Sequence, residues 1–257
     1  MFKYEYPVFE HKNILKKAML DELRDYPLSI SRMLLSECGD GILMGCEISW
    51  DKEVLTVQPG LLHYGGHIYR MEEPYEVECR PTDSLTYIKV RFVTMDYERD
   101  HMGGLGEIIL SEDAPEGEEM ELGRFRLQEG ARLRTVYENF EDYQTEYDTV
   151  NRIHVPYAQS DGAGLWHKLL TDYATELLVT GTEDAFDISF AMQLLGTQGR
   201  VAGGLVKWYV EKAGGRRLTD AGNEAVYTGL LRILKERRAG GSGWKRQEPL
   251  KKQMILL

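Results

Sequence analysis

The chain has 257 residues, of which 42% are hydrophobic and 28% charged, and its formal net charge is −11 at pH 7. These fractions are ordinary for globular proteins and exclude the collagen-like, wholly disordered and disulfide-scaffold classes. No apolar run approaches the ~20 residues that cross a bilayer, and 3 cysteines are too few for a disulfide framework. We therefore expect a cytoplasmic or particle-associated protein that makes no membrane contact.

The charge is unevenly distributed along the chain. Residues 1–150 carry 31 acidic and 16 basic side chains, whereas residues 151–257 carry 11 acidic and 15 basic ones. Such asymmetry predicts two parts with different surfaces. The acidic part would repel nucleic acid, and the basic part could approach it or an acidic protein face.

The first segment, residues 1–38, is predicted to be helical. Apolar residues between Ile14 and Leu23 recur at near-helical spacing. Pro27 disfavours a helical conformation at the preceding residue, so the first helix should end near Asp25 and a shorter one should follow.

Residues 39–150 are predicted to form an antiparallel β domain. Short runs rich in strand-forming residues alternate with turn signals such as Pro59-Gly60 and Gly65-Gly66. Asp51-Lys52 indicates a tight hairpin without the usual glycine. Strands are expected in this region at 47–50, 53–57, 61–64, 67–71, 75–79, 86–92, 107–110 and 122–127, with the glycine-rich 102–106 and the acidic 111–121 as loops between them.

Residues 151–240 show the spacing of amphipathic helices instead. One apolar stripe runs from Trp166 to Leu177, with Ser160 or Asp161 as the expected N-cap. Further helices are expected after Thr182, over 201–213 and after Thr219. Residues 241–257 then form a basic tail, which follows a glycine-rich link. The predicted fold class is α+β: short helices, an antiparallel β-sandwich or barrel, and a C-terminal helical bundle.

The sequence lacks the usual signatures of catalysis and of cofactor binding. Neither a phosphate-binding GxxxxGK[ST] nor a GxSxG motif is present. The three cysteines lack CxxC spacing, and glycines separate His63 from His67, so no metal site is predicted. We expect a protein that is not an enzyme and needs no cofactor.

Two sets of residues are candidates for contact with a partner. Tyr137, Phe140, Tyr143 and Tyr147 recur every three or four residues, and on a helix they would form one aromatic face. That face would either pack within the chain or serve as a subunit interface. A second candidate set is basic and comprises Arg237, Arg238, Trp244, Lys245, Arg246, Lys251 and Lys252.

The stretch from Gly39 to Arg70 resembles a β module of phage tail, baseplate and tail-fibre proteins. In that module a Gly-Ile-Leu-x-Gly-x-Glu-Ile run, a Val-x-Pro-Gly turn and a Gly-Gly-x-Ile-Tyr hairpin follow one another. The opening residues also resemble uncharacterised proteins of Firmicutes prophage tail clusters. The residues that carry the resemblance are Gly41, Ile42, Gly45, Glu47, Ile48, Val57, Pro59, Gly60, Gly65, Gly66, Ile68 and Tyr69, with Leu122, Gly123, Arg124 and Arg132 in the later strand.

The resemblance implies a structural, oligomeric component of a prophage-derived tail or baseplate, with other tail or baseplate proteins as its partners. Two other functions remain open. One is a nucleic-acid-associated module acting through the basic C-terminal helix and tail, over 232–252. The other is a carbohydrate-binding β domain that uses His63, Tyr64 and Tyr69 near hairpin tips.

Overall fold

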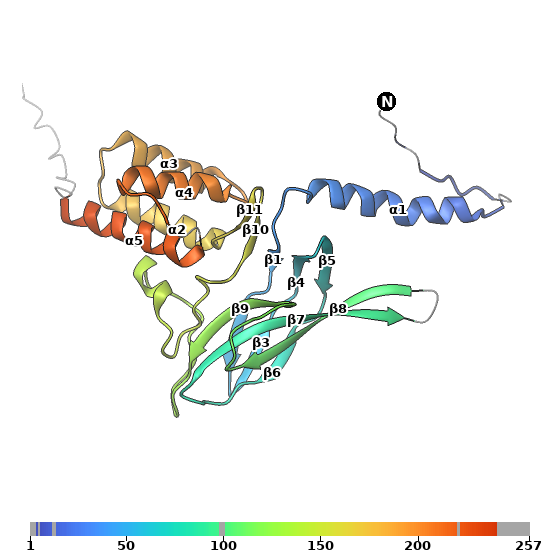
Figure 1. Ribbon diagram of the computed structural model, residues 1–257, viewed down its shortest axis with the longest axis horizontal. Helices are drawn as coiled ribbons and strands as arrows, with labels where there is room; N and C mark the ends of the chain where they lie inside the picture. Colours follow the sequence, from blue (N-terminus) through green and yellow to red (C-terminus); the bar gives the residue numbers. More distant parts are fainter. Residues whose placement is uncertain (1–3, 5, 12–13, 98–100, 220–221, 241–257) are drawn as a thin grey trace, which may run out of the picture.

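A β-rich part and a helical part follow one another along the chain, and a separate N-terminal helix precedes both (Figure 1). The computed structural model describes all residues except 1–3, 5, 12–13, 98–100, 220–221 and 241–257. The helices are α1 (Lys17–Leu34), α2 (His167–Val179), α3 (Ala185–Gly196), α4 (Gly203–Ala213) and α5 (Asn223–Gly240), with a short 3-10 helix, η1, at Phe140–Gln144. The strands are β1 (Gly41–Gly45), β2 (Ile48–Asp51), β3 (Val54–Val57), β4 (Gly60–Tyr64), β5 (His67–Met71), β6 (Tyr75–Glu78), β7 (Leu85–Tyr97), β8 (His101–Ser111), β9 (Glu119–Arg126), β10 (Tyr157–Gln159) and β11 (Gly162–Gly164).

The strands form three sheets around one apolar core. Their orders are β11-β10-β1-β4-β5, β2-β3-β6 and β8-β7-β9. Neighbouring strands are antiparallel except at the β1–β10 pair, where Ile42 lies opposite Tyr157 in a parallel arrangement. Side chains from all three sheets meet in this core, among them Ile42, Leu55 and Ile88, each at most 1% exposed. The predicted α+β class is confirmed.

The predicted hairpin at Asp51-Lys52 is present and joins β2 to β3. Its two turn residues, Lys52 and Glu53, both have positive φ angles, 48° and 64°. Two-residue turns of this kind match the twist of the flanking strands, and glycine usually supplies the positive φ. Here two residues with side chains adopt it.

The prediction that residues 102–106 form a loop is wrong, because they belong to β8. That strand pairs with β7 along its whole length, from Tyr87 opposite Ser111 to the hairpin end. At Gly104 a Cβ atom would lie 2.7 Å from the Tyr69 hydroxyl, so a larger residue would have to displace the Tyr69 side chain. The glycines therefore permit close packing on a neighbouring strand rather than a turn.

The expected N-cap of α2 is also wrong. Asp161 lies in the β10–β11 turn, and its carboxylate accepts hydrogen bonds of 2.7 Å from the backbone N–H groups of Gly203 and Gly204. It thus satisfies the free donors at the start of α4, a helix about 40 residues away in sequence. The contact fixes the β10–β11 hairpin to the helical part.

The helices α2 to α5 enclose a second apolar core. Tyr173, Leu177 and Tyr209 are completely buried in it, together with Phe140 and Tyr143 of η1. Trp166 packs against both this core and the core of the sheets. The division of the chain into four segments (1–38, 39–150, 151–240 and 241–257) stays a prediction. The β10–β11 hairpin belongs to segment 151–240, but it pairs with β1 in a sheet of segment 39–150.

The predicted break in the first helix does not occur. A single helix, α1, runs from Lys17 to Leu34 with Pro27 inside it. Proline removes one backbone donor, and serine hydroxyls bond to carbonyls at the same turn, Ser29 to Tyr26 and Ser31 to Pro27, each at 2.8 Å. Of the helices that the structure describes, none is both long and apolar enough to cross a bilayer.

Candidate interaction surfaces

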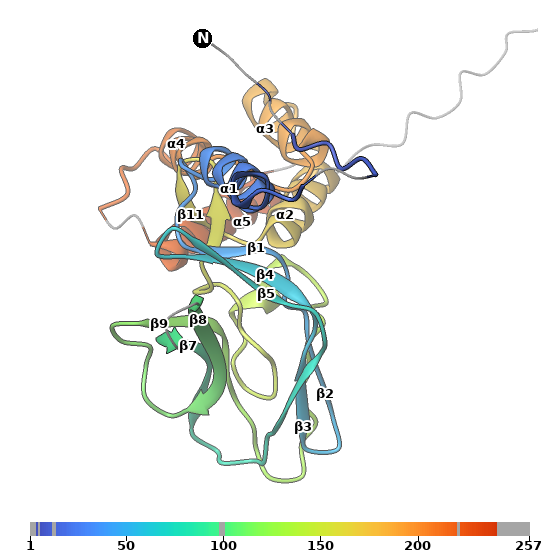
Figure 2. The ribbon, with the colours of Figure 1, turned by 90° about the vertical axis from the view of Figure 1, so that its right-hand side faces the viewer.

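Among the described helices and strands, α1 carries the largest set of exposed apolar side chains. The helix projects away from the sheets and from the helical part (Figures 1 and 2), and none of its residues is buried. Isolated helices of this length are marginal in water unless an apolar face is covered. Its large exposed side chains are Leu20 (49%), Leu23 (50%), Tyr26 (44%), Leu28 (49%), Ile30 (40%), Met33 (75%) and Leu34 (75%).

Five apolar residues of α1 follow a heptad pattern. Met19, Leu23, Tyr26, Ile30 and Met33 are spaced by four, three, four and three residues. This 3.5-residue period is typical of a seam at which two helices coil around each other. We call these five residues the α1 seam. The spacing is present in the sequence, but the expected break at Pro27 concealed it.

The root of α1 is fixed to the rest of the protein. Leu35, directly after the helix, is 8% exposed, and the Gly39 N–H donates to the Gly162 carbonyl at 2.9 Å. A Cβ atom at Gly39 would lie 2.4 Å from the Gly162 backbone, so only glycine permits this approach. The C-terminal end of α1 is therefore anchored at the β10–β11 hairpin.

The predicted aromatic helix face does not form. Only the five residues of η1 are helical, and Phe140 and Tyr143 are both fully buried among the helices. Tyr137 stacks on Tyr143 with ring centroids 3.9 Å apart and donates a hydrogen bond of 2.6 Å to the Val150 carbonyl. These three rings are thus held inside the chain. Tyr147, which is 59% exposed, stays a predicted partner contact.

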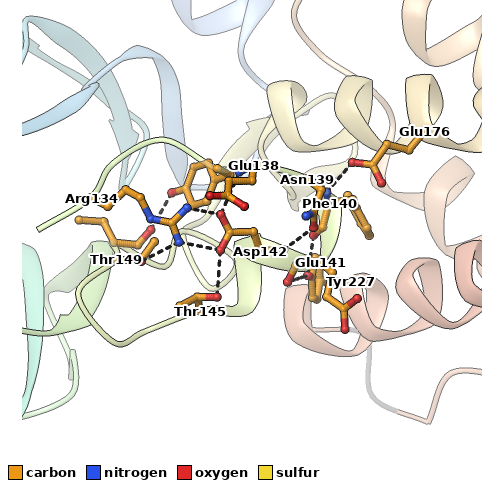
Figure 3. A network of polar contacts seen from close by, with 12 residues as sticks. Arg134, Glu138, Asn139, Phe140, Glu141, Asp142, Thr145, Thr149, Glu176 and Tyr227 are labelled. Carbon is orange, nitrogen blue, oxygen red and sulfur yellow. Dashed lines mark hydrogen bonds and ion pairs between the residues drawn. The ribbon is translucent and has the colours of Figure 1, made fainter.

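Polar contacts around η1 explain why this segment turns inward (Figure 3). The Arg134 guanidinium pairs with both oxygens of Asp142, and its Nη2 lies 2.7 Å from Oδ1. The Asn139 side chain caps η1 by accepting from the Asp142 N–H. The Tyr227 hydroxyl donates to the Phe140 carbonyl at 2.8 Å, which ties η1 to α5. Arg134 also lowers the pKa of the Asp142 carboxyl below its ordinary value.

The described members of the predicted basic set are engaged within the chain. Arg237 Nε donates to Asp187 Oδ2 at 2.6 Å, and Arg238 pairs with Glu176 on α2. The other predicted contacts, Trp244, Lys245, Arg246, Lys251 and Lys252, lie outside the described residues. The nucleic-acid alternative is therefore a prediction that now depends mainly on them.

A cavity of about 800 Å³ opens between the free edges of two sheets. Strand β5 ends one sheet and β8 ends another, and no strand pairing joins them in the described ranges. Residues 67–71 of β5 and 103–108 of β8 form its walls, and core side chains such as Leu62, Val90 and Leu122 close its floor. We call this cavity the edge groove.

Two of the three residues of the carbohydrate-binding alternative, His63 and Tyr64, are engaged within the chain. The Tyr64 ring stacks on Phe92, with centroids 3.8 Å apart and an interplanar angle of 7°, and its hydroxyl donates to Glu118. His63 is only 8% exposed, with Nδ1 3.1 Å from the Gly39 carbonyl oxygen. A sugar would have to displace these internal contacts.

Within the described ranges, no three His, Cys, Asp or Glu residues are grouped as a metal site would require. Burial raises the pKa of the Cys46 and Cys79 thiols to about 11, so these thiols stay protonated and unreactive. The prediction that the protein is not an enzyme remains a prediction.

Two solved structures resemble this chain distantly. One is a chain of the type VI secretion system TssK-TssF-TssG baseplate subcomplex, at 13% identity and a TM-score of 0.45, covering 92% of this chain and 100% of that one. The other is TssK in a crystal structure, at 10% identity and a TM-score of 0.39, covering 92% and 72%. No protein-family model and no curated protein matches the sequence. Likeness of this degree says nothing of what the chain does.

Proposed function

We propose that the protein is a non-catalytic structural subunit of a particle of the prophage tail or baseplate kind, in which copies associate through the α1 seam. The observation that supports self-association is a helix of 18 residues without a single buried side chain and with an apolar heptad seam. A soluble monomer rarely leaves such a stripe uncovered. The resemblance of residues 39–70 to tail and baseplate modules supports the kind of particle.

The ends of the seam favour a second copy of the same chain as the partner. Lys16 lies directly before the helix and Glu37 shortly after it, 21 residues apart, and both are exposed. An antiparallel pair would place each Lys16 near the Glu37 of the other copy, whereas a parallel pair would bring like charges together.

Charge placed in the seam tests the association. Leu23→Glu with Ile30→Glu is expected to raise the dissociation constant at least about tenfold, because each substitution would bury an unpaired carboxylate. Leu28→Glu is the matched control, since Leu28 is equally exposed but lies off the seam. Light scattering after size-exclusion chromatography gives the masses. A wild-type monomer over the whole accessible concentration range would refute association through α1.

Membership of a particle needs its own experiment. The protein would be co-expressed with the products of the genes beside its own, and tagged wild type and the seam double variant would be purified in parallel. Co-purification of sheath, tube or baseplate proteins with the wild type supports the proposal. Recovery of the tagged chain without any of them contradicts its particle part and leaves the self-association result unaffected.

A further inference from the structure

We infer that the edge groove receives the N-terminal arm of a second copy as an added β-strand. The arm consists of residues 4–10. The inference rests on the association of copies through α1, and it assigns a binding role to a cavity that this association alone does not use.

The groove has the features of a site for strand addition. The outer edges of β5 and β8 present backbone N–H and C=O groups that no strand pairing satisfies in the described residues. Gly103 and Gly104 of β8 are exposed along the groove, with the Tyr69 hydroxyl of β5 lying over Gly104. A strand can therefore approach closely, and its side chains on one face would enter the apolar floor.

The arm has the matching pattern. Tyr4, Tyr6 and Val8 alternate with other residues and are 77%, 69% and 53% exposed. The Tyr4 and Tyr6 rings lie parallel with centroids 6.2 Å apart, which is the arrangement of residues i and i+2 on one face of an extended chain. These three side chains would fill the groove.

The proline of the arm fits addition to one edge. Residues 4, 6 and 8 direct their backbone groups to one side of an extended chain, and Pro7 directs its own to the other. Bonding of Tyr6 to β8 therefore places the missing N–H of Pro7 away from that edge. Proline is tolerated at such positions.

The position of the arm favours a second copy as its acceptor. Helix α1 is about 27 Å long at ~1.5 Å per residue, and the arm lies at its far end from the sheets (Figure 1). In an antiparallel pair, the start of each α1 lies beside the end of the other. Each arm then emerges near the sheets of the partner copy, within reach of its groove.

Disulfide formation between two different cysteine variants tests whether the arm of one copy binds the groove of another, which we call arm exchange. Both would carry Cys38→Ser to remove the half-buried native thiol. One would also carry Pro7→Cys, and the other Leu105→Cys beside the groove, where Leu105 is 48% exposed; both side chains would lie on the face turned away from the groove floor, because side chains alternate along a strand. Mixing and mild oxidation should join the two chains, as non-reducing electrophoresis would show. The control partner carries Val179→Cys, at an 82% exposed position on α2, and should not be joined.

The outcomes separate this inference from the proposed function. A mixed cross-link with Leu105→Cys but not with Val179→Cys supports arm exchange. Equal cross-linking to both positions, or none while light scattering still shows association, overturns it and leaves the association through α1 standing. A cross-link only within a Pro7→Cys, Leu105→Cys double variant would assign the groove to the chain's own arm and refute exchange. A monomer in the same sample refutes both.

Discussion

The guanidinium of Arg152 lies 4.6 Å from the centroid of the Trp166 ring, at the junction between the sheets and the helical part. Arg152 is only 4% exposed, and its Nη2 donates to the Cys46 carbonyl at 3.2 Å. The Tyr157 ring lies beside the Trp166 ring, with centroids 6.0 Å apart, and its centroid is 5.5 Å from the guanidinium. One buried cation thus connects β10, the entry to α2 and the end of β1.

Removal of this cation should loosen the junction. Arg152→Ala is expected to lower the free energy of unfolding by about 2–4 kcal/mol, because it abolishes the contact with two rings and leaves a buried carbonyl without its donor. Urea unfolding followed by tryptophan fluorescence and by circular dichroism measures the loss. If fluorescence and circular dichroism report different unfolding midpoints for the variant, the sheets and the helices no longer unfold together.

The ion-pair partner of Arg152 supplies the control. Glu47 is 57% exposed and lies 3.6 Å from the guanidinium, so solvent screens the pair. Glu47→Gln should cost less than about 1 kcal/mol. A cost as large as that of Arg152→Ala would mean that the ion pair, rather than the stacking, holds the junction.

Local patterns predicted most of the strands, because alternation and turn residues act over a few positions. The Asp51-Lys52 hairpin is an example, since its strands pair directly across the turn. Pairings between distant segments have no local sequence pattern that would predict them. The parallel contact of Ile42 with Tyr157 and the capping of α4 by Asp161 depend on tertiary structure alone.

The interaction surfaces were predicted less well for a related reason. Phe140 and Tyr143 have helical spacing in the sequence, but their burial is decided by the distant α2 and α5, which cover them. The α1 seam was readable from the sequence, yet the local effect of Pro27 argued against a continuous helix. The edge groove could not be foreseen, because it arises from which strands end each sheet.

The Arg134–Asp142 pair should make stability depend on pH in the acid range. Arg134 lowers the pKa of Asp142 in the folded state, so the pair stabilises the fold above the ordinary carboxyl pKa of about 4. Its contribution is lost as the pH falls through the lower folded-state value. Wild type should therefore exceed Asp142→Asn by about 1–3 kcal/mol at pH 7, and the difference should shrink towards pH 2.

Urea midpoints at several pH values give this difference directly. Arg134→Met is the companion variant, and the double variant completes a cycle that isolates the pair. The coupling between the two residues should be present at pH 7 and absent once Asp142 is protonated in both states. If the difference in unfolding free energy between wild type and Asp142→Asn does not change with pH, the ion pair is not its source.

The three cysteines should differ in reactivity. Cys46 and Cys79 are 3% and 1% exposed, and burial raises the pKa of both to about 11, whereas Cys38 is partly exposed beside Arg200. At pH 8 a disulfide reagent such as DTNB should react rapidly with one thiol per native chain and with three after unfolding. Cys38→Ser should abolish the rapid phase. Two or more rapid thiols in the native protein would show that the sheet core admits the reagent.

Two neighbouring arginines of α5 should differ sharply in their importance. Arg237 Nε lies 2.6 Å from Asp187, which is completely buried and also accepts from the Tyr209 hydroxyl at 2.9 Å. Arg238 pairs with Glu176 at the surface and is 43% exposed. Arg237→Met leaves a buried carboxylate without its cation and should cost about 3–5 kcal/mol, whereas Arg238→Met should cost about 0–1 kcal/mol.

Adding Asp187→Asn to Arg237→Met should recover part of the loss, because the buried charge is then removed with its partner. Equal losses for the two single arginine variants would contradict this difference. Arg238→Met also tests the nucleic-acid alternative, because this variant should keep the fold while it removes a positive charge from the surface of α5. If α5 binds an oligonucleotide at low salt, Arg238→Met should weaken that binding and reduce its salt dependence. Unchanged binding would exclude Arg238 as a phosphate contact.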